Sequence, residues 1–237
     1  MIIQLFQQPM AQRQRIALYV ALAFHISGFI AIGLLESQLF INLTPLNLLV
    51  CLALILYTQP RLQWGFVVFA ICALVIGFGT EHIGINTGAL FGQYAYGEVL
   101  GPKWQGVPYM IGVQWLVTMY CIGVAMQMLL HRFLQNGLSS FHRYPRWMQG
   151  LSLVIDGALL AVIFDWAIEP VAMHLHYWYW QNDVIPMFNY LTWYGVSAVI
   201  LCIFHLLPFH KHNLFAVHLL LIQFMFFLLL RTVFAFQ

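Results

Sequence analysis

The sequence predicts an all-α polytopic membrane protein, and both its composition and the spacing of its apolar segments support this class. Of the 237 residues, 62% are hydrophobic and only 7% are charged, whereas an ordinary soluble domain carries about 25% charged residues. Too few charges remain to cover a water-soluble surface. No hydrophilic block is long enough to fold separately, so we expect a single transmembrane domain over residues 1–237.

Seven apolar segments approach the length of a membrane-spanning helix, which needs about 20 residues, with about 17–25 tolerated. The segment 42–58 is the weakest, because it is short and Pro45 lies near its start. Arg13 and Arg15 precede the first segment as in a signal peptide, but no small-residue cleavage site follows, so we expect this helix to remain. The predicted helices are 16–35, 42–58, 63–82, 107–130, 149–170, 187–207 and 213–234.

The basic residues predict the orientation, because short loops rich in Lys and Arg face the cytoplasm. Only Lys103 and Arg231 fall on the side opposite to the N-terminus. We therefore expect a cytoplasmic N-terminus and an outer C-terminus, in the cytoplasmic membrane of a bacterium. The formal net charge of +2 gives no reason to expect a nucleic acid partner. The basic residues on the N-terminal side are Arg13, Arg15, Arg61, Arg132, Arg143, Arg146 and Lys211.

Three acids, Glu81, Asp165 and Glu169, lie in apolar helices or at their ends. A charge in such a place costs a few kcal/mol or more and commonly lines a cavity or belongs to a functional pair. Asp165 and Glu169 are four residues apart, so they share one helix face and would repel each other if both were ionised. We expect one of them to hold a proton near neutral pH and to act as a proton donor.

The stretch from Glu81 to Trp115 interrupts the apolar pattern with two acids, seven glycines and two prolines. We expect it to form one side of an active site, with glycines 84, 88 and 92 letting the chain fold back. Aromatic residues around the acids form either an interfacial belt or a pocket whose π faces stabilise a carbocation, a contact worth about 2 kcal/mol or more when desolvated. They are Phe91, Tyr94, Tyr96, Trp104, Trp115, Trp166, Trp178, Tyr179, Trp180, Tyr190 and Trp193.

Two runs of residues carry a family resemblance. The first is Glu81-x-x-Gly84-x-x-x-Gly88-x-x-Phe91-Gly92-x-Tyr94-x-Tyr96, followed by Gly106-Val107-Pro108 and Trp115. The second is Asp165-x-x-x-Glu169-Pro170, then Trp178-x-Trp180, Ile185-Pro186-x-x-Asn189 and Trp193. Together they extend over about half the chain and resemble the carotenoid biosynthesis membrane proteins that include the carotenoid 1′,2′-hydratases. His176-Tyr177 stands where that family often has a Gly before the first Trp.

The resemblance implies addition of water to the terminal 1′,2′ double bond of an acyclic carotenoid end group of the lycopene or γ-carotene type, without cofactor or metal. It implies Asp165 or Glu169 as the acid and Glu81 as the group that orients or deprotonates water. The carotenoid would lie in the bilayer with its end group at the acids, and other carotenoid enzymes are candidate partners. The expected substrate-binding residues are Phe91, Tyr94, Tyr96, Trp115, Trp166, Trp178, Trp180, Asn189 and Trp193.

Three other membrane classes fit the sequence poorly. A retinal protein needs a lysine in a late helix, but Lys103 and Lys211 lie in loops. A polyprenyl transferase needs two Asp-rich motifs for Mg²⁺ and diphosphate, and one acid pair is present. A di-iron oxygenase needs histidines that converge, whereas those here divide between the two sides, with His174 and His176 outside and His131, His142, His205, His210 and His212 inside.

Two alternatives stay open. A carotenoid cyclase also begins by protonating the end group, but an internal double bond rather than water captures the cation, so the product mass distinguishes the two. A transporter or a carotenoid-binding protein is the alternative outside enzymes, because acids in membrane helices also serve proton relays.

Overall fold

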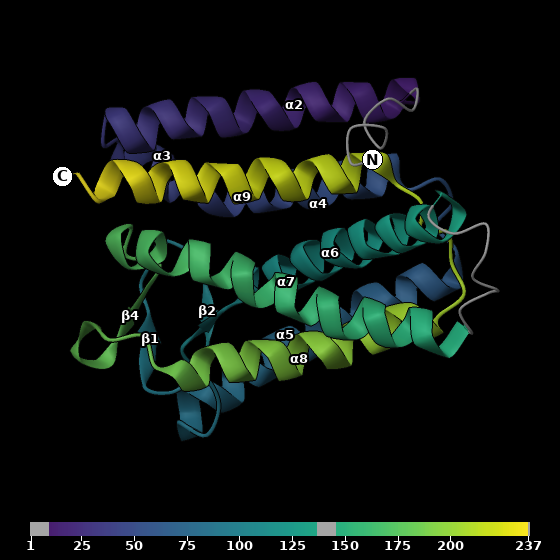
Figure 1. Ribbon diagram of the computed structural model, residues 1–237. Coiled ribbons are helices and arrows are strands. Elements are labelled where there is room, and N and C mark those ends of the chain that lie inside the picture. Colours follow the sequence, from purple (N-terminus) through teal and green to yellow (C-terminus); the bar gives the residue numbers. More distant parts are fainter. Residues whose placement is uncertain (1–9, 137–145, 237) are drawn as a thin grey trace.

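The computed structural model describes residues 10–136 and 146–236, apart from the side chains of 132–136 and 146, and forms a bundle of long helices (Figure 1). Six helices are long and apolar enough to cross a membrane. The first continues without a break into a π-helical turn, η1 (Ile30–Leu34). The six are α2 (Gln12–Phe29), α5 (Trp64–Thr87), α6 (Tyr109–Asn136), α7 (Arg146–His174), α8 (Met187–Leu206) and α9 (Leu214–Phe234).

The predicted segment 42–58 forms the short helix α4 (Thr44–Thr58), preceded by the single turn α3 (Gln38–Asn42). Pro45 lies in the first turn of α4, where its missing N–H costs no hydrogen bond. With 15 residues, α4 is shorter than the roughly 17–25 residues that a full crossing needs. The seven apolar segments of the sequence therefore correspond to six long helices and one short helix.

Helix α6 lies at the centre of the bundle and contacts α4, α5, α7, α8 and α9. Of its most apolar 18-residue window, 72% is buried, against 28–44% for the other long helices. Those helices keep exposed Leu, Ile, Val and Phe side chains on their outer faces, as expected where lipid is the solvent. Residues on α6 are therefore placed to meet several neighbours at once.

Short strands lie at one end of the bundle, where α5, α7 and α9 end and where α6 and α8 begin (Figure 1). We call this end the strand end. β1 (Tyr94–Tyr96) pairs antiparallel with β4 (Trp178–Trp180), so that Tyr94 faces Trp180 and Tyr96 faces Trp178. β2 (Lys103–Trp104) pairs with β3 (Val107–Pro108) in the same way. These strands were not predicted, and β4 leads through the turn η2 (Gln181–Asp183) into α8.

The connection after α5 folds back as the glycines predict. Helix α5 ends at Gly88, whose φ of 66° is in the left-handed region that favours glycine. Gly92 follows with a φ of 124°, and the chain then enters β1. Glu81 itself lies six residues before the end of α5, so the predicted connector begins inside a helix.

Helix α7 continues to His174, past Pro170, where the sequence prediction ended it. Proline has no N–H, so it leaves the carbonyl four residues earlier without its helical donor. That carbonyl belongs to Trp166, and Arg231 Nη1 donates to it at 2.8 Å. The Arg231 guanidinium also lies 3.8 Å from the centroid of the Trp166 ring. Arg231 thus ties α9 to α7 at the irregular turn.

The beginning of α2 and the end of α9 lie at opposite ends of the bundle (Figure 1). The short helix α4 and the six long helices alternate in direction along the bundle, which places them in this way. The side of the membrane that each end faces stays a prediction. Arg143, which was counted for it, lies outside the described residues, and so does His142, which was counted among the inner histidines.

Gly77→Ala is expected to destabilise the bundle, whereas Gly79→Ala on the same helix is its control. A Cβ at Gly77 would lie 2.4 Å from the Cβ of Trp115, but nothing lies within 4 Å of a Cβ at Gly79. Overpacking costs about 1–3 kcal/mol, which lowers the midpoint of thermal unfolding by about 2–4 °C per kcal/mol at this chain length. Equal midpoints for the two variants would contradict the close approach of α5 and α6.

Candidate functional site

Glu81 is buried on α5, and its carboxylate accepts three side-chain hydrogen bonds. Tyr94 and Tyr96 donate their hydroxyls to Oε2 at 2.5 and 2.8 Å, and Trp115 Nε1 donates to Oε1 at 3.0 Å. The side chain is only 5% exposed. Three directed donors are the arrangement that stabilises a carboxylate in its ionised form.

Asp165 and Glu169 lie on one face of α7 and share a donor, as their spacing predicts. Asn189 on α8 donates its Nδ2 to Asp165 Oδ2 at 2.8 Å and to Glu169 Oε1 at 3.1 Å. Glu169 Oε2 also accepts Trp178 Nε1 at 2.9 Å and Trp180 Nε1 at 2.7 Å. Both acids are at most 2% exposed.

The strand pair brings the donors to these acids. Alternate residues of a strand point to the same side, so Tyr94 and Tyr96 of β1 both reach Glu81, and Trp178 and Trp180 of β4 both reach Glu169. Because β1 and β4 are paired, the two donor sets are fixed relative to each other. In the described part of the chain, every hydrogen-bond partner of the three acids is a neutral side chain.

Aromatic rings pack around the acids. Trp115 on α6 and Trp193 on α8 are stacked, with ring centroids 4.0 Å apart and planes inclined by 17°. Across the strand pair, the Tyr94 ring lies 5.1 Å from Trp180. Phe91 packs edge-on against Tyr94 and donates its backbone N–H to Thr192 Oγ1 at 3.2 Å. Aromatic rings therefore make up most of the apolar surroundings of the acids.

These groups line a small cavity of about 20 Å³. Such a space has room for about one water molecule, which needs roughly 10–15 Å³, but not for an isoprenoid end group. Every predicted site residue lines it except Trp166, which is 46% exposed and packs against Arg231 instead. The placement of Trp166 in the pocket was wrong. Sequence reasoning missed two lining residues, Ile111 and Gln114.

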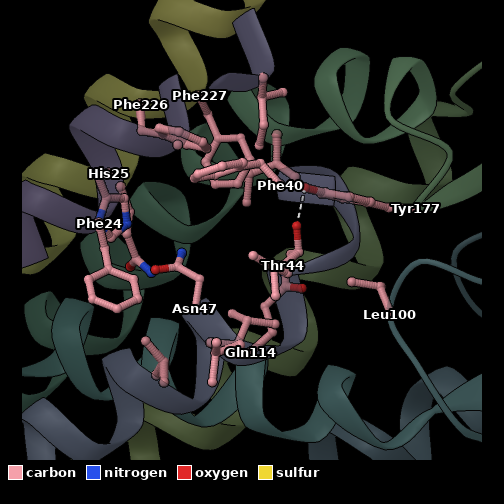
Figure 2. A pocket seen from close by; sticks show the side chains of 18 of the residues that line it. Phe24, His25, Phe40, Thr44, Asn47, Leu100, Gln114, Tyr177, Phe226 and Phe227 are labelled. Carbon is pink, nitrogen blue, oxygen red and sulfur yellow. Dashed lines mark hydrogen bonds between the residues drawn. The ribbon is translucent and has the colours of Figure 1, made fainter. Parts of the chain in front are cut away.

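A larger cavity of about 480 Å³, which we call the chamber, lies beside the acids among α2, α4, α6, α7 and α9 (Figure 2). Its lining is mostly apolar, and its volume falls within the roughly 300–1,000 Å³ typical of ligand pockets. Gln114 and Trp178 line both cavities and form the wall between them. Trp178 is held by Glu169, whereas the Gln114 side chain has no hydrogen-bond partner among the described residues.

No group of three His, Cys, Asp or Glu side chains suited to a metal ion lies within residues 10–131 and 147–236. The polar groups that line the small cavity are carboxyl groups, phenols, indoles and the amides of Gln114 and Asn189. Burial, and then the charge of Glu81, raise the pKa of Tyr94 and of Tyr96 well above the usual tyrosine value. Both phenols remain hydrogen-bond donors throughout the physiological pH range.

Trp180→Phe is expected to destabilise the protein by about 1–3 kcal/mol, because Glu169 loses a buried donor. Trp64→Phe is the matched control, since the same change is made at a residue that is 77% exposed. The midpoint of thermal unfolding in detergent measures both. A second pair, Trp180→Phe with and without Glu169→Leu, should show that the cost depends on the carboxyl group. An equal cost in both backgrounds would contradict the hydrogen bond.

Stability should fall at alkaline pH, because the pKa of Tyr94 and Tyr96 is higher in the folded than in the unfolded state. Their contribution is fully present below the ordinary tyrosine pKa of about 10 and is lost as pH rises above it. Combining Tyr94→Phe with Tyr96→Phe should reduce this alkaline loss, measured as the change in unfolding midpoint from pH 9 to pH 11. Tyr19→Phe, at a residue 68% exposed, should leave the loss as in the wild type.

Comparison with protein families gives one match, a family described as carotenoid biosynthesis protein, over residues 43–237. Comparisons with curated proteins and with solved structures gave no match. The matched range begins at the residue before α4 and contains the strand pair, the three acids and Asn189. Helix α2, which contributes to the chamber, precedes it. Because the match extends over far more than half of its length, the chain belongs to the carotenoid biosynthesis protein family.

Proposed function

We propose that the protein is a carotenoid 1′,2′-hydratase, which adds water to the terminal double bond of an acyclic carotenoid end group of the lycopene or γ-carotene type. The observation that carries the proposal is the carboxyl pair Asp165 and Glu169, bridged by Asn189 beside a cavity with room for about one water. The family assigns the chain to carotenoid biosynthesis, and this arrangement supplies an acid next to a place for water.

Asp165 is the better candidate for the acid. Glu169 accepts hydrogen bonds from Asn189, Trp178 and Trp180, which stabilise its anion, whereas Asp165 accepts one from Asn189. Two acids this close do not both ionise readily, so the proton rests on the carboxyl with fewer donors. In the first step the Asp165 O–H bond breaks, and the π electrons of the double bond form a new bond between this proton and C2′. C1′ then remains as a tertiary cation.

The aromatic lining stabilises that cation. Trp115 and Trp193 form the stacked pair at the cavity, and Tyr94 and Trp180 lie on the strand side. A cation over an indole face gains about 2 kcal/mol or more when water is excluded. Tryptophan N–H groups and tyrosine hydroxyls point at the carboxylates, so the rings line the same cavity as the acids.

Glu81 is placed to take up the proton that water releases. Water adds through its oxygen to C1′, and the resulting oxonium loses one proton to a carboxylate, which gives the tertiary alcohol. The net change is the addition of one water, without oxidation or reduction. Tyr94, Tyr96 and Trp115 donate hydrogen bonds that favour the anion of Glu81, and protons return to Asp165 through water or the neighbouring acids.

We place the strand end at the outer surface of the bacterial cytoplasmic membrane, as the basic residues predict. The acids lie close to that end, Glu169 five residues before the end of α7. Water then has a short path to the site, while the polyene remains in the bilayer. Other carotenoid enzymes in the same membrane would exchange substrate and product with it.

Pigments of a lycopene-producing host that expresses the chain test the proposal by chromatography with mass analysis. A product heavier by one water is expected for the wild type. A shifted pigment of unchanged mass would indicate the cyclase, and no chemical change would indicate a transporter or binding protein. Asp165→Asn is expected to lower hydration by about 10²-fold or more, the usual contribution of a general acid.

Glu169→Gln and Glu81→Gln should also impair hydration, since each removes a carboxylate from the small cavity. Asp156→Asn is the matched control, because Asp156 is an exposed acid on the same helix and is hydrogen-bonded to Ser152. It should hydrate as the wild type does. Full hydration by all three cavity variants would show that the acids of this site are not used.

A further inference from the structure

The chamber contains two buried amide oxygens that lack partners. Gln223 Oε1 on α9 and Asn47 Oδ1 on α4 are each shielded and have no hydrogen bond among the described residues. Gln223 is only 7% exposed, and its amide nitrogen makes a single long contact of 3.8 Å with Cys51 Sγ. Buried polar atoms in native proteins are nearly always paired, so these two oxygens indicate a ligand with a donor.

The other polar groups of the chamber indicate which functional group the ligand carries. His25 Nδ1 lies 2.8 Å from the Ala21 carbonyl and donates to it, which leaves Nε2 as a third acceptor. Thr44 and Tyr177 are hydrogen-bonded to each other at 2.7 Å. Figure 2 shows Asn47 on the side of His25, with Leu100 and Tyr177 on the other side. A hydroxyl group fits an amide well, because it can donate to the oxygen and accept from the nitrogen.

The rest of the chamber suits an apolar chain. Phe40, Phe164, Phe226 and Phe227 line it. The exposed lining residues are on α2 and at the beginning of α4, among them Phe24 at 40% and Leu46 at 50%. The chamber therefore reaches the outer face of the bundle between these helices, where a long isoprenoid can continue into the bilayer.

We propose that the chamber binds the hydrated end group, that is, an acyclic carotenoid carrying a tertiary hydroxyl, with that hydroxyl hydrogen-bonded to Gln223 or Asn47. The proposal rests on the proposed hydratase function, because that reaction converts an end group without a donor into one with a donor. Gln114 and Trp178 are the described residues that line both the chamber and the small cavity, so the alcohol has a short way to move.

Binding should therefore favour the alcohol over the hydrocarbon. One hydrogen bond to a buried amide corresponds to a preference of about 2- to 10-fold. The probes are lycopene and 1-hydroxylycopene, and quenching of tryptophan fluorescence in the detergent-purified full chain measures their dissociation constants. The Asp165→Asn variant is used as the background so that neither probe is converted.

Gln223→Leu combined with Asn47→Leu should bind both probes equally. Ser197→Ala is the matched control, because Ser197 Oγ on α8 is also buried and unpaired but does not line the chamber. It should keep the full preference for the alcohol. If the double variant fails to fold, Gln223→Met alone keeps the length of the side chain and should lower the preference.

Two results would overturn the proposal. The first is equal binding of the two probes in the unsubstituted chamber, which would mean that the amides bind water only. The second is a preference for the alcohol that survives removal of both amides. Either can occur while the host still forms the hydrated pigment, so the hydratase function would stand. Conversely, a preference for the alcohol without hydration in the host would leave the chamber site intact and refute the reaction.

Discussion

Carboxyl groups buried in a membrane bundle need hydrogen-bond donors, and the β1–β4 strand pair supplies most of those that Glu81 and Glu169 accept. A charge inside an apolar bundle is costly, and the partners of these acids in the described chain are neutral. Two strands of three residues each would be weak alone. The strand pair is stable because its aromatic side chains are hydrogen-bonded to acids on two different helices, and the acids in turn need these donors. The side chains are Tyr94, Tyr96, Trp178 and Trp180.

This mutual dependence explains why the helices were easier to predict than the site that joins them. Composition alone required long apolar helices, and Pro45 together with a short run correctly marked α4 as the weakest. The pairing of Asp165 and Glu169 followed from helical spacing. The strands did not, because Tyr94-Ala95-Tyr96 and Trp178-Tyr179-Trp180 are short enough to pass for part of an interfacial aromatic belt. Their alternation was the signal that could have revealed them.

Trp166 shows how nearness in sequence misleads. It follows Asp165 directly, but neighbouring residues on a helix point about 100° apart, so only the residues three and four positions away share a face. Pro170 then frees the Trp166 carbonyl, and Arg231 takes both that carbonyl and the ring. Trp166 therefore joins α7 to α9 through Arg231. The chamber was beyond sequence reasoning for a different reason, since residues of α2, α3, α4, α6, α7 and α9 contribute to it.

In the proposed reaction, the two cavities meet different demands. Stabilising a cation requires fixed rings and little water, and the small cavity, with its stacked Trp115 and Trp193, meets that demand by being nearly full. Holding an isoprenoid requires volume, which the chamber provides. Of the two residues in the shared wall, Trp178 donates a hydrogen bond to Glu169. If Trp178 moved, Glu169 would lose this hydrogen bond. Gln114 has no such bond among the described residues. In the proposed reaction the end group therefore reaches the acids past Gln114, with the strand pair left in place.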